Sequence, residues 1–149
     1  MSTTTILPDM DLGIPRVNSH GYPDSTAFKA LKQIQRAEFG YRPLVYICSP
    51  YSGDVAANVE LARSLCRVAV EHKMIPLAPH LHYPQFMNDT NPGDRELAMF
   101  MGRILLSKCE AIWVHTARVS SGMRAEIGWA RQLDLPIKYF DADFEEVTP

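Results

Sequence analysis

The carboxylate of Glu126 is the strongest candidate for a catalytic group in the sequence. It lies in the stretch SSGMRAE, residues 120–126, whose serine and glycine residues are typical of a helix start. With Ser121 as the N-cap, Glu126 projects back toward the beginning of the helix, where backbone N–H groups favour a negative charge. An ionised carboxylate can act as a nucleophile. The alternative is structural, since a glutamate near its start stabilises any helix.

The turn sequence SPYSGD, residues 49–54, offers hydroxyl and backbone groups for binding an anion. It follows the apolar run LVYIC and precedes an amphipathic helix, and N–H groups at such a helix start bind phosphate. It lacks the glycine patterns of dinucleotide-binding and ATP-binding loops, so we expect no cofactor of either kind and no cofactor at all. An ordinary turn, capped by Ser52 or Asp54, is the alternative.

A long connection, residues 78–92, carries two histidines and an aspartate. Its polar and aromatic sequence predicts a loop, and loops of this length in compact domains tend to be functional. On an extended segment, His80 and His82 point to the same side, as two metal ligands would. No HExxH or CxxC motif accompanies them, so we expect no metal and assign the histidines to hydrogen bonds with a ligand or the backbone.

An alternation of apolar runs and amphipathic helices positions these three segments. We expect strands at 44–48, 74–77, 111–114 and 136–140, with a helix between each strand and the next, and Pro76 indicates an edge strand or a strand end. Strands that alternate with helices pair in parallel through right-handed crossovers. The prediction is an α/β fold, a Rossmann-like or flavodoxin-like three-layer domain with a parallel sheet of four to five strands. In such a sheet ligands bind beyond the carboxyl ends of the strands, where all three segments lie.

Length and composition limit the class of protein. The chain has 149 residues, 21% of them charged, and a net charge of −2, which is typical of one globular domain and gives no electrostatic basis for binding a nucleic-acid polymer. No apolar run is long enough to span a membrane, so we expect no membrane partner. Cys48, Cys66 and Cys109 are odd in number and lie in apolar stretches, so we expect reduced thiols in a cytoplasmic protein.

Together these features resemble the nucleoside 2-deoxyribosyltransferase-like superfamily, which includes deoxynucleoside monophosphate N-glycosidases. The resemblance covers residues 43 to about 140 and rests on VYIC followed by the Ser/Gly turn, on CEAIWV, and on SxGxxxE at residues 120–126. It implies that Glu126 is the nucleophile, which attacks C1′ of the sugar and expels the base, and that Tyr46 helps hold its carboxylate. SPYSGD, PHLHYPQF and GMRAEI look closer still to a branch often encoded by phages and their bacterial hosts.

The resemblance also indicates where the ligand, a small-molecule nucleotide or nucleoside, would bind. Ser120 stands where relatives that bind a 5′-phosphate have a serine. The expected substrate-binding residues are Ser49, Tyr51, Ser52, Gly53, His80, His82, Ser120, Gly122 and Met123. A proton for the departing base is expected to come from Asp89, His80 or His82.

The family's catalytic aspartate has no counterpart at its expected place. That place falls between Met99 and Gly102, where no residue is acidic. The acids nearby that would substitute for it are Asp89, Asp94 and Glu96.

The resemblance implies an N-glycosidase or deoxyribosyltransferase that cleaves the base–sugar bond of a (deoxy)nucleoside 5′-monophosphate through a carboxylate nucleophile. Water as the acceptor makes the enzyme a hydrolase, and a second base makes it a transferase; both belong to nucleotide metabolism. The missing aspartate favours an alternative, a non-catalytic protein on the same scaffold that binds a nucleotide or a nucleotide-derived signal. A metal-dependent phosphoesterase centred on His80 and His82 has only that pair in its favour.

Residues 1–42 and 43–149 are expected to differ in structure. The first segment has no hydrophobic period at its start and is predicted to be an N-terminal arm with a short helix bearing Phe28, Leu31 and Ile34. The second is predicted to be the nucleoside 2-deoxyribosyltransferase-like domain. Its helices carry more apolar residues than one face needs, and relatives complete each pocket with a neighbour's residues, so we expect a homodimer or higher homo-oligomer. An arm that folds back over this surface is the alternative.

Overall fold

The structure, a computed structural model, describes residues 29–30, 33–34 and 39–149. Of the predicted arm helix, Phe28 and Leu31 lie outside the described residues, whereas Ile34 is helical. The chain divides into two units, Met1–Tyr41 and Arg42–Pro149. The sheet, the helices around it and the candidate site all belong to the second unit.

A sheet of five strands forms the centre of the second unit, in the order β2-β1-β3-β4-β5. The strands are β1 (Leu44–Cys48), β2 (Ile75–Leu77), β3 (Ala111–His115), β4 (Ile137–Phe140) and β5 (Glu146–Val147). The first four pair in parallel, which confirms the predicted parallel core. The short β5 pairs antiparallel with β4, so the sheet as a whole is mixed. Pro76 lies in the edge strand β2, as a strand residue without an N–H requires.

Helices connect the parallel strands. They are α3 (Val55–Glu71), α4 (Pro79–His82), the 3₁₀ helix η1 (Tyr83–Gln85), α5 (Pro92–Ser107) and α6 (Ser121–Gln132). Side-chain caps fix the starts of the two longest. Asp54 accepts a hydrogen bond from the Ala57 N–H at 3.2 Å before α3, and Asn91 accepts one from the Asp94 N–H at 3.1 Å before α5.

The connection at residues 78–92, predicted as a loop, contains α4 and η1. Pro79 and Pro84 each stand in the first turn of one of these helices, where the N–H that proline lacks has no intrahelical partner anyway. The loop prediction was wrong because both helices are too short for a hydrophobic period to show. The consequence is a rigid wall beside the carboxyl ends of β1 and β2.

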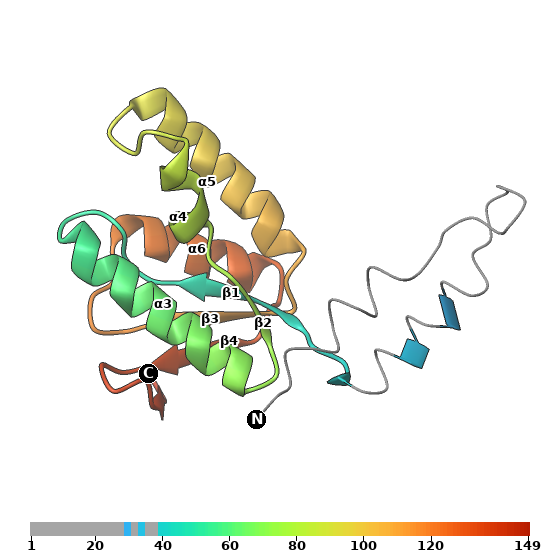
Figure 1. The fold of residues 1–149 in the computed structure, drawn as a ribbon. Helices are drawn as coiled ribbons and strands as arrows, with labels where there is room; N and C mark the ends of the chain where they lie inside the picture. Colours follow the sequence, from blue (N-terminus) through green and yellow to red (C-terminus); the bar gives the residue numbers. More distant parts are fainter. Residues whose placement is uncertain (1–28, 31–32, 35–38) are drawn as a thin grey trace, which may run out of the picture. The chain divides into compact units, whose positions relative to one another are not determined.

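Alternate residues of the strands face two separate hydrophobic clusters, which gives the predicted three layers. Val45, Ile47 and Trp113 pack on the face toward α3, together with Leu65 and Ala69 of that helix. The other face of the same strands packs against α5 and α6. Figure 1 shows α3 on one side of the strands and α6 on the other, with α5 on the same side as α6.

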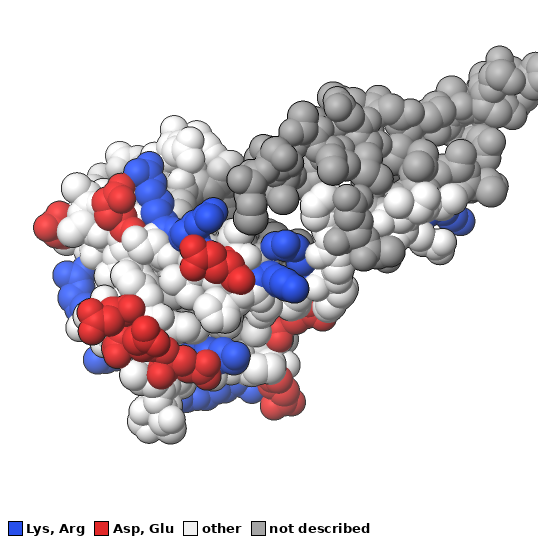
Figure 2. Space-filling model, turned by 60° about the horizontal axis from the view of Figure 1, so that its bottom comes forward, with Lys and Arg blue, Asp and Glu red and all other residues white. Residues whose placement is uncertain are grey.

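The structure also describes the cysteines, the lengths of the helices and the charge on one face. The three cysteines are free thiols. Within the described ranges, no helix has the length and apolarity needed to cross a membrane. On the face drawn in Figure 2, basic and acidic side chains lie next to one another. This face therefore presents mixed charge, not a basic stripe.

Candidate active site

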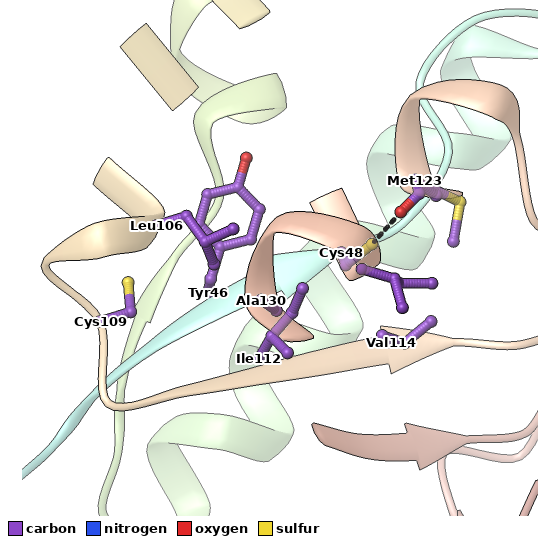
Figure 3. Close-up of a cluster of buried hydrophobic side chains, with 9 residues drawn as sticks. Tyr46, Cys48, Leu106, Cys109, Ile112, Val114, Met123 and Ala130 are labelled. Atoms are coloured by element: carbon purple, nitrogen blue, oxygen red, sulfur yellow. Dashed lines mark hydrogen bonds between the residues drawn. The ribbon is translucent and has the colours of Figure 1, made fainter. Parts of the chain in front are cut away.

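Glu126 and Tyr46 meet where α6 passes over the carboxyl end of β1. The Tyr46 hydroxyl donates a hydrogen bond to Oε1 of Glu126 at 3.2 Å. Tyr46 is buried in β1, and Figure 3 shows its ring on the same side of the strand as Cys48, two residues along. The thiol of Cys48 in turn lies 3.8 Å from the Met123 carbonyl at the start of α6. The motif around Glu126 and the strand tyrosine, far apart in sequence, thus form one buried group.

The N-cap of α6 is Ser120, one residue before the predicted Ser121. Ser120 has an extended backbone, and its hydroxyl accepts a hydrogen bond from the Met123 N–H at 3.2 Å. Both serines satisfy the N-cap preference, so the sequence alone does not distinguish them. The correction moves Glu126 one position further from the helix start.

Burial dominates the electrostatics of Glu126. It raises the pKa of this carboxyl group from 4.5 to about 7, against hydrogen bonds from the Cys48 thiol and the Tyr46 hydroxyl that lower it. The helix start was expected to favour the ionised form of Glu126, but burial acts in the opposite direction and is the larger effect. The effect of helix N–H groups fades after the first turn, and Glu126 lies beyond it. Burial also raises the pKa of Tyr46 far above its usual value, so its hydroxyl stays protonated and is able to donate to Glu126.

A cavity of about 120 Å³ opens above this pair. Its walls come from the turn after β1, from α4 and η1, from α5 and from the start of α6. Among the residues predicted for the site, those that line the cavity are Tyr46, Ser49, Tyr51, Ser52, His80, Asp89, Ser120, Gly122, Met123 and Glu126. Most of the predicted site is therefore assembled at the predicted edge of the sheet.

His80 and His82 separate because they lie in a helix and not on an extended segment. Nε2 of His80 is 2.7 Å from the Ser49 hydroxyl, and the ring lines the cavity. His82 is exposed, its ring contacts those of Tyr83 and Phe86, and it is not among the lining residues, so the structure does not bring it into the cavity with His80. Burial lowers the pKa of His80 to about 4, which leaves it neutral at pH 7. In the described part of the chain, no three His, Cys, Asp or Glu side chains are grouped so that they could hold a metal ion.

Gly53 also falls outside the lining. Its φ is +98°, a conformation that favours glycine, and its α-carbon faces the guanidinium of Arg118. The turn therefore needs this glycine for its shape and for the approach of Arg118, not for a place in the cavity wall.

The wall from α5 carries no acid. Ala98, Met99 and Gly102 line the cavity, and a β-carbon at Gly102 would lie only 3.3 Å from the Tyr46 hydroxyl. Of the acids considered as substitutes for the aspartate, Asp89 lines the cavity, whereas neither Asp94 nor Glu96 does. The carboxylate of Asp94 accepts a hydrogen bond from the Asn88 N–H at 2.8 Å instead.

Sequence reasoning missed the lining residues contributed by α4, η1 and α5. They are Pro79, Tyr83, Pro84, Arg95, Ala98, Met99 and Gly102. The α5 members recur at steps of three and four residues, which is the signal of one helix face. That signal shows which residues share a face but does not show what the face covers.

Residues 43–140 match the family described as "Domain of unknown function (DUF7768)". The chain belongs to this family. The match includes all four parallel strands and every residue that lines the cavity. No curated protein matches the DUF7768 chain.

Two solved structures resemble this DUF7768 domain. One is a 2-deoxyribosyltransferase from the psychrotolerant bacterium Bacillus psychrosaccharolyticus, with a TM-score of 0.51 and 14% identity over 70% of this chain and 77% of that one. The other is a 2-deoxyribosyltransferase from Leishmania mexicana, with a TM-score of 0.49 and 17% identity over 68% of this chain and 65% of that one. The first similarity shows that the DUF7768 domain has a nucleoside 2-deoxyribosyltransferase-like fold, as the sequence predicts.

Proposed function

We propose that the protein cleaves the base–sugar bond of a (deoxy)nucleoside 5′-monophosphate, with Glu126 as the nucleophile. The observation that carries the proposal is a half-buried carboxylate, held by a tyrosine hydroxyl, in the wall of a cavity on this fold. A purely structural glutamate would face solvent at a helix start, where it costs no desolvation. Placing one in a cavity wall costs desolvation, and carboxyl groups with pKa values shifted in this way gather at functional sites.

The geometry supports a two-step displacement. The Tyr46 hydroxyl holds Oε1 of Glu126, which leaves the second oxygen to attack C1′ of the sugar. The C1′–O bond forms as the bond between C1′ and the base nitrogen breaks, through an oxocarbenium-like transition state. Water then attacks C1′ and releases the free sugar phosphate, or a second base attacks and forms a new nucleotide. The carboxylate of Glu126 is restored in either case, and in hydrolysis the proton that the attacking water loses replaces the one given to the departing base.

The departing base must gain a proton, and Asp89 is the group we assign to supply it. Apart from Glu126, it contributes the one carboxyl group in the cavity lining. His80 is neutral at pH 7 and contacts the Ser49 hydroxyl, so it serves to fix the turn after β1. The exposed His82 takes no part.

Binding without turnover is the second candidate, and the α5 wall favours it. Methionine and glycine stand where the resemblance leads us to expect an aspartate, and the Tyr46 hydroxyl fills the space at Gly102. A cavity of this kind would hold a nucleotide or a nucleotide-derived signal and leave its glycosidic bond intact.

Incubation with each of the four 2′-deoxynucleoside 5′-monophosphates separates the two candidates. We expect free base to appear with at least one of them, at a rate proportional to protein concentration. Binding of the same compounds is measured in parallel by calorimetry. Binding without release of base would support the second candidate. If the protein neither binds these compounds nor releases base from them, both candidates are excluded.

Self-association remains part of the proposal. Leu97, Phe100 and Ile104 on α5 are 48%, 61% and 46% exposed, and their spacing places them on one face of that helix. We propose that a second copy of the chain covers this face in a homodimer or higher oligomer. Light scattering at micromolar concentration should give a multiple of the monomer mass, and a monomeric mass would contradict the proposal.

A further inference from the structure

Arg118 links the two loops that border the cavity at the ends of β1 and β3. Its Nη2 donates a hydrogen bond to the Ser52 carbonyl at 2.6 Å, across 66 positions of sequence. The same carbonyl accepts a hydrogen bond from Nδ2 of Asn58 at 3.0 Å. Ser52 itself lines the cavity. Arg118 is therefore not part of the lining itself, but its guanidinium holds the backbone of a residue that a ligand would touch.

Gly53 allows this approach. A β-carbon built at Gly53 would lie 3.1 Å from Nη1 and 3.3 Å from Nη2 of Arg118. Any other residue would be strained at a φ of +98°, and its β-carbon would require the guanidinium to shift by a few tenths of an ångström. The backbone of the turn and the guanidinium are thus fitted to each other.

Most of the hydrogen-bonding capacity of Arg118 remains unused. A guanidinium has five N–H donors, and the Ser52 carbonyl takes one of them. Across the residues that the structure describes, no carboxylate lies within ion-pair distance of Arg118. The side chain is exposed, so an incoming anion can reach it.

The place of Arg118 in the fold is the one where α/β sheets bind ligands. β1 and β3 are neighbours in the sheet, and the chain leaves β1 toward β2 on one side and returns as β3 on the other. Such a switch point opens a crevice beyond the strand ends. Arg118 spans this crevice from the loop after β3 to the turn after β1.

From this placement we infer that Arg118 determines specificity by selecting ligands that carry a 5′-phosphate over unphosphorylated nucleosides. The inference rests on the proposed function. Glu126 and Asp89 both bring acid groups to the cavity, so a phosphate dianion needs a cation beside it. Arg95 lines the cavity, and Arg118 is the arginine bound to the backbone of the turn after β1. A planar guanidinium binds two phosphate oxygens at once, and its contact with Ser52 already orients it.

The experiment compares the dissociation constants of the four 2′-deoxynucleoside 5′-monophosphates with those of the matching nucleosides. Arg118→Gln should weaken binding of the monophosphates about 10- to 100-fold and leave binding of the nucleosides within about twofold. Arg118→Lys keeps the positive charge but lacks the planar guanidinium, so it should weaken monophosphate binding less than Arg118→Gln does. The matched control is Arg124→Gln, because Arg124 is exposed on α6 and outside the lining. It should change the dissociation constants of neither the monophosphates nor the nucleosides.

Other outcomes would overturn the inference in distinguishable ways. Equal weakening of monophosphates and nucleosides would show that Arg118 only supports the turn. Loss of the phosphate preference in Arg95→Gln but not in Arg118→Gln would assign the role to the arginine on α5. Equal binding of monophosphates and nucleosides by the wild type would refute the phosphate selection but would remain compatible with an enzyme that acts on nucleosides. Failure of the wild type to bind either would refute the proposed function itself.

Discussion

The two faces of β1 differ in chemistry although they are equally buried. On the α3 side, Val45 and Ile47 pack among aliphatic and aromatic side chains and carry no polar group. On the α6 side, Tyr46 and Cys48 are just as buried, yet both bear polar hydrogens beside the carboxyl group of Glu126. One strand thus contributes purely apolar side chains on its α3 face and, on its α6 face, side chains that belong both to a hydrophobic cluster and to the candidate site.

This difference has an energetic meaning. The α3 face stabilises the fold by apolar burial alone. The α6 face holds an acid whose ionised form is costly to bury, and two hydrogen bonds offset only part of that cost. Substitutions on the α6 face should therefore change activity, and some should raise stability. Those on the α3 face should change stability alone.

The largest expected effect is on turnover in Glu126→Gln. Glutamine keeps the size and can still accept from Tyr46, but it is not a nucleophile. If base release occurs, it should fall by roughly a thousandfold or more. Arg124→Gln on the same helix is the control and should retain activity. Full activity of Glu126→Gln would remove this residue from the mechanism.

The same substitution should stabilise the protein at high pH. The pKa of Glu126 is about 7 in the folded state and 4.5 in the unfolded chain, so the folded state holds the proton more tightly. Stability of the wild type therefore falls as pH rises from about 4.5 to 7 and stays lower above that. Glu126→Gln lacks this loss and should be more stable by about 2–3 kcal/mol at pH 8, with little difference at pH 4. Denaturant unfolding at both pH values would measure it, and a parallel shift at both would contradict the account.

Tyr46→Phe should have a smaller effect, and one that depends on pH. Its hydroxyl lowers the pKa of Glu126, so its loss should raise that pKa and move the rising limb of the rate profile to higher pH. At pH 7 we expect kcat/KM to fall about tenfold, and the deficit should narrow at pH 9. An unchanged profile midpoint would show that the hydroxyl does not act through Glu126.

Ile47→Val tests the other face with the smallest change. It removes one buried methylene on the α3 side and should lower the free energy of unfolding by about 1 kcal/mol. The value of kcat should stay within twofold of the wild type. A marked loss of activity without loss of stability would contradict the separation of the two faces.

Local signals predicted one half of the site and missed the other. The strand ends, the Ser/Gly turn and the residues around Glu126 are visible because each is a short motif beside an apolar run. The α4 and α5 walls depend on which helix face turns toward the cavity, and that is decided by tertiary packing. The prediction that His82 points to the same side as His80 was wrong for the same reason. Both residues lie in the short helix α4, where side chains two positions apart point to different sides.

The raised pKa of Glu126 could not be predicted from the sequence either. The expected effect of the helix start depends only on residues that are neighbours along the chain. The raised pKa comes from burial by groups that lie elsewhere in the fold. The partnership with Tyr46, by contrast, followed from the resemblance, and the hydrogen bond between them is present in the structure.

Mass spectrometry of acid-quenched reactions tests the central claim most directly. The account predicts a covalent adduct of the sugar phosphate on the peptide that contains Glu126 when the wild type reacts with a 2′-deoxynucleoside 5′-monophosphate that it cleaves. The adduct should be absent in Glu126→Gln and shorter-lived when a free base is added as acceptor. Release of base with no adduct on this peptide, or with an adduct on another residue, would contradict the assignment of Glu126 as the nucleophile.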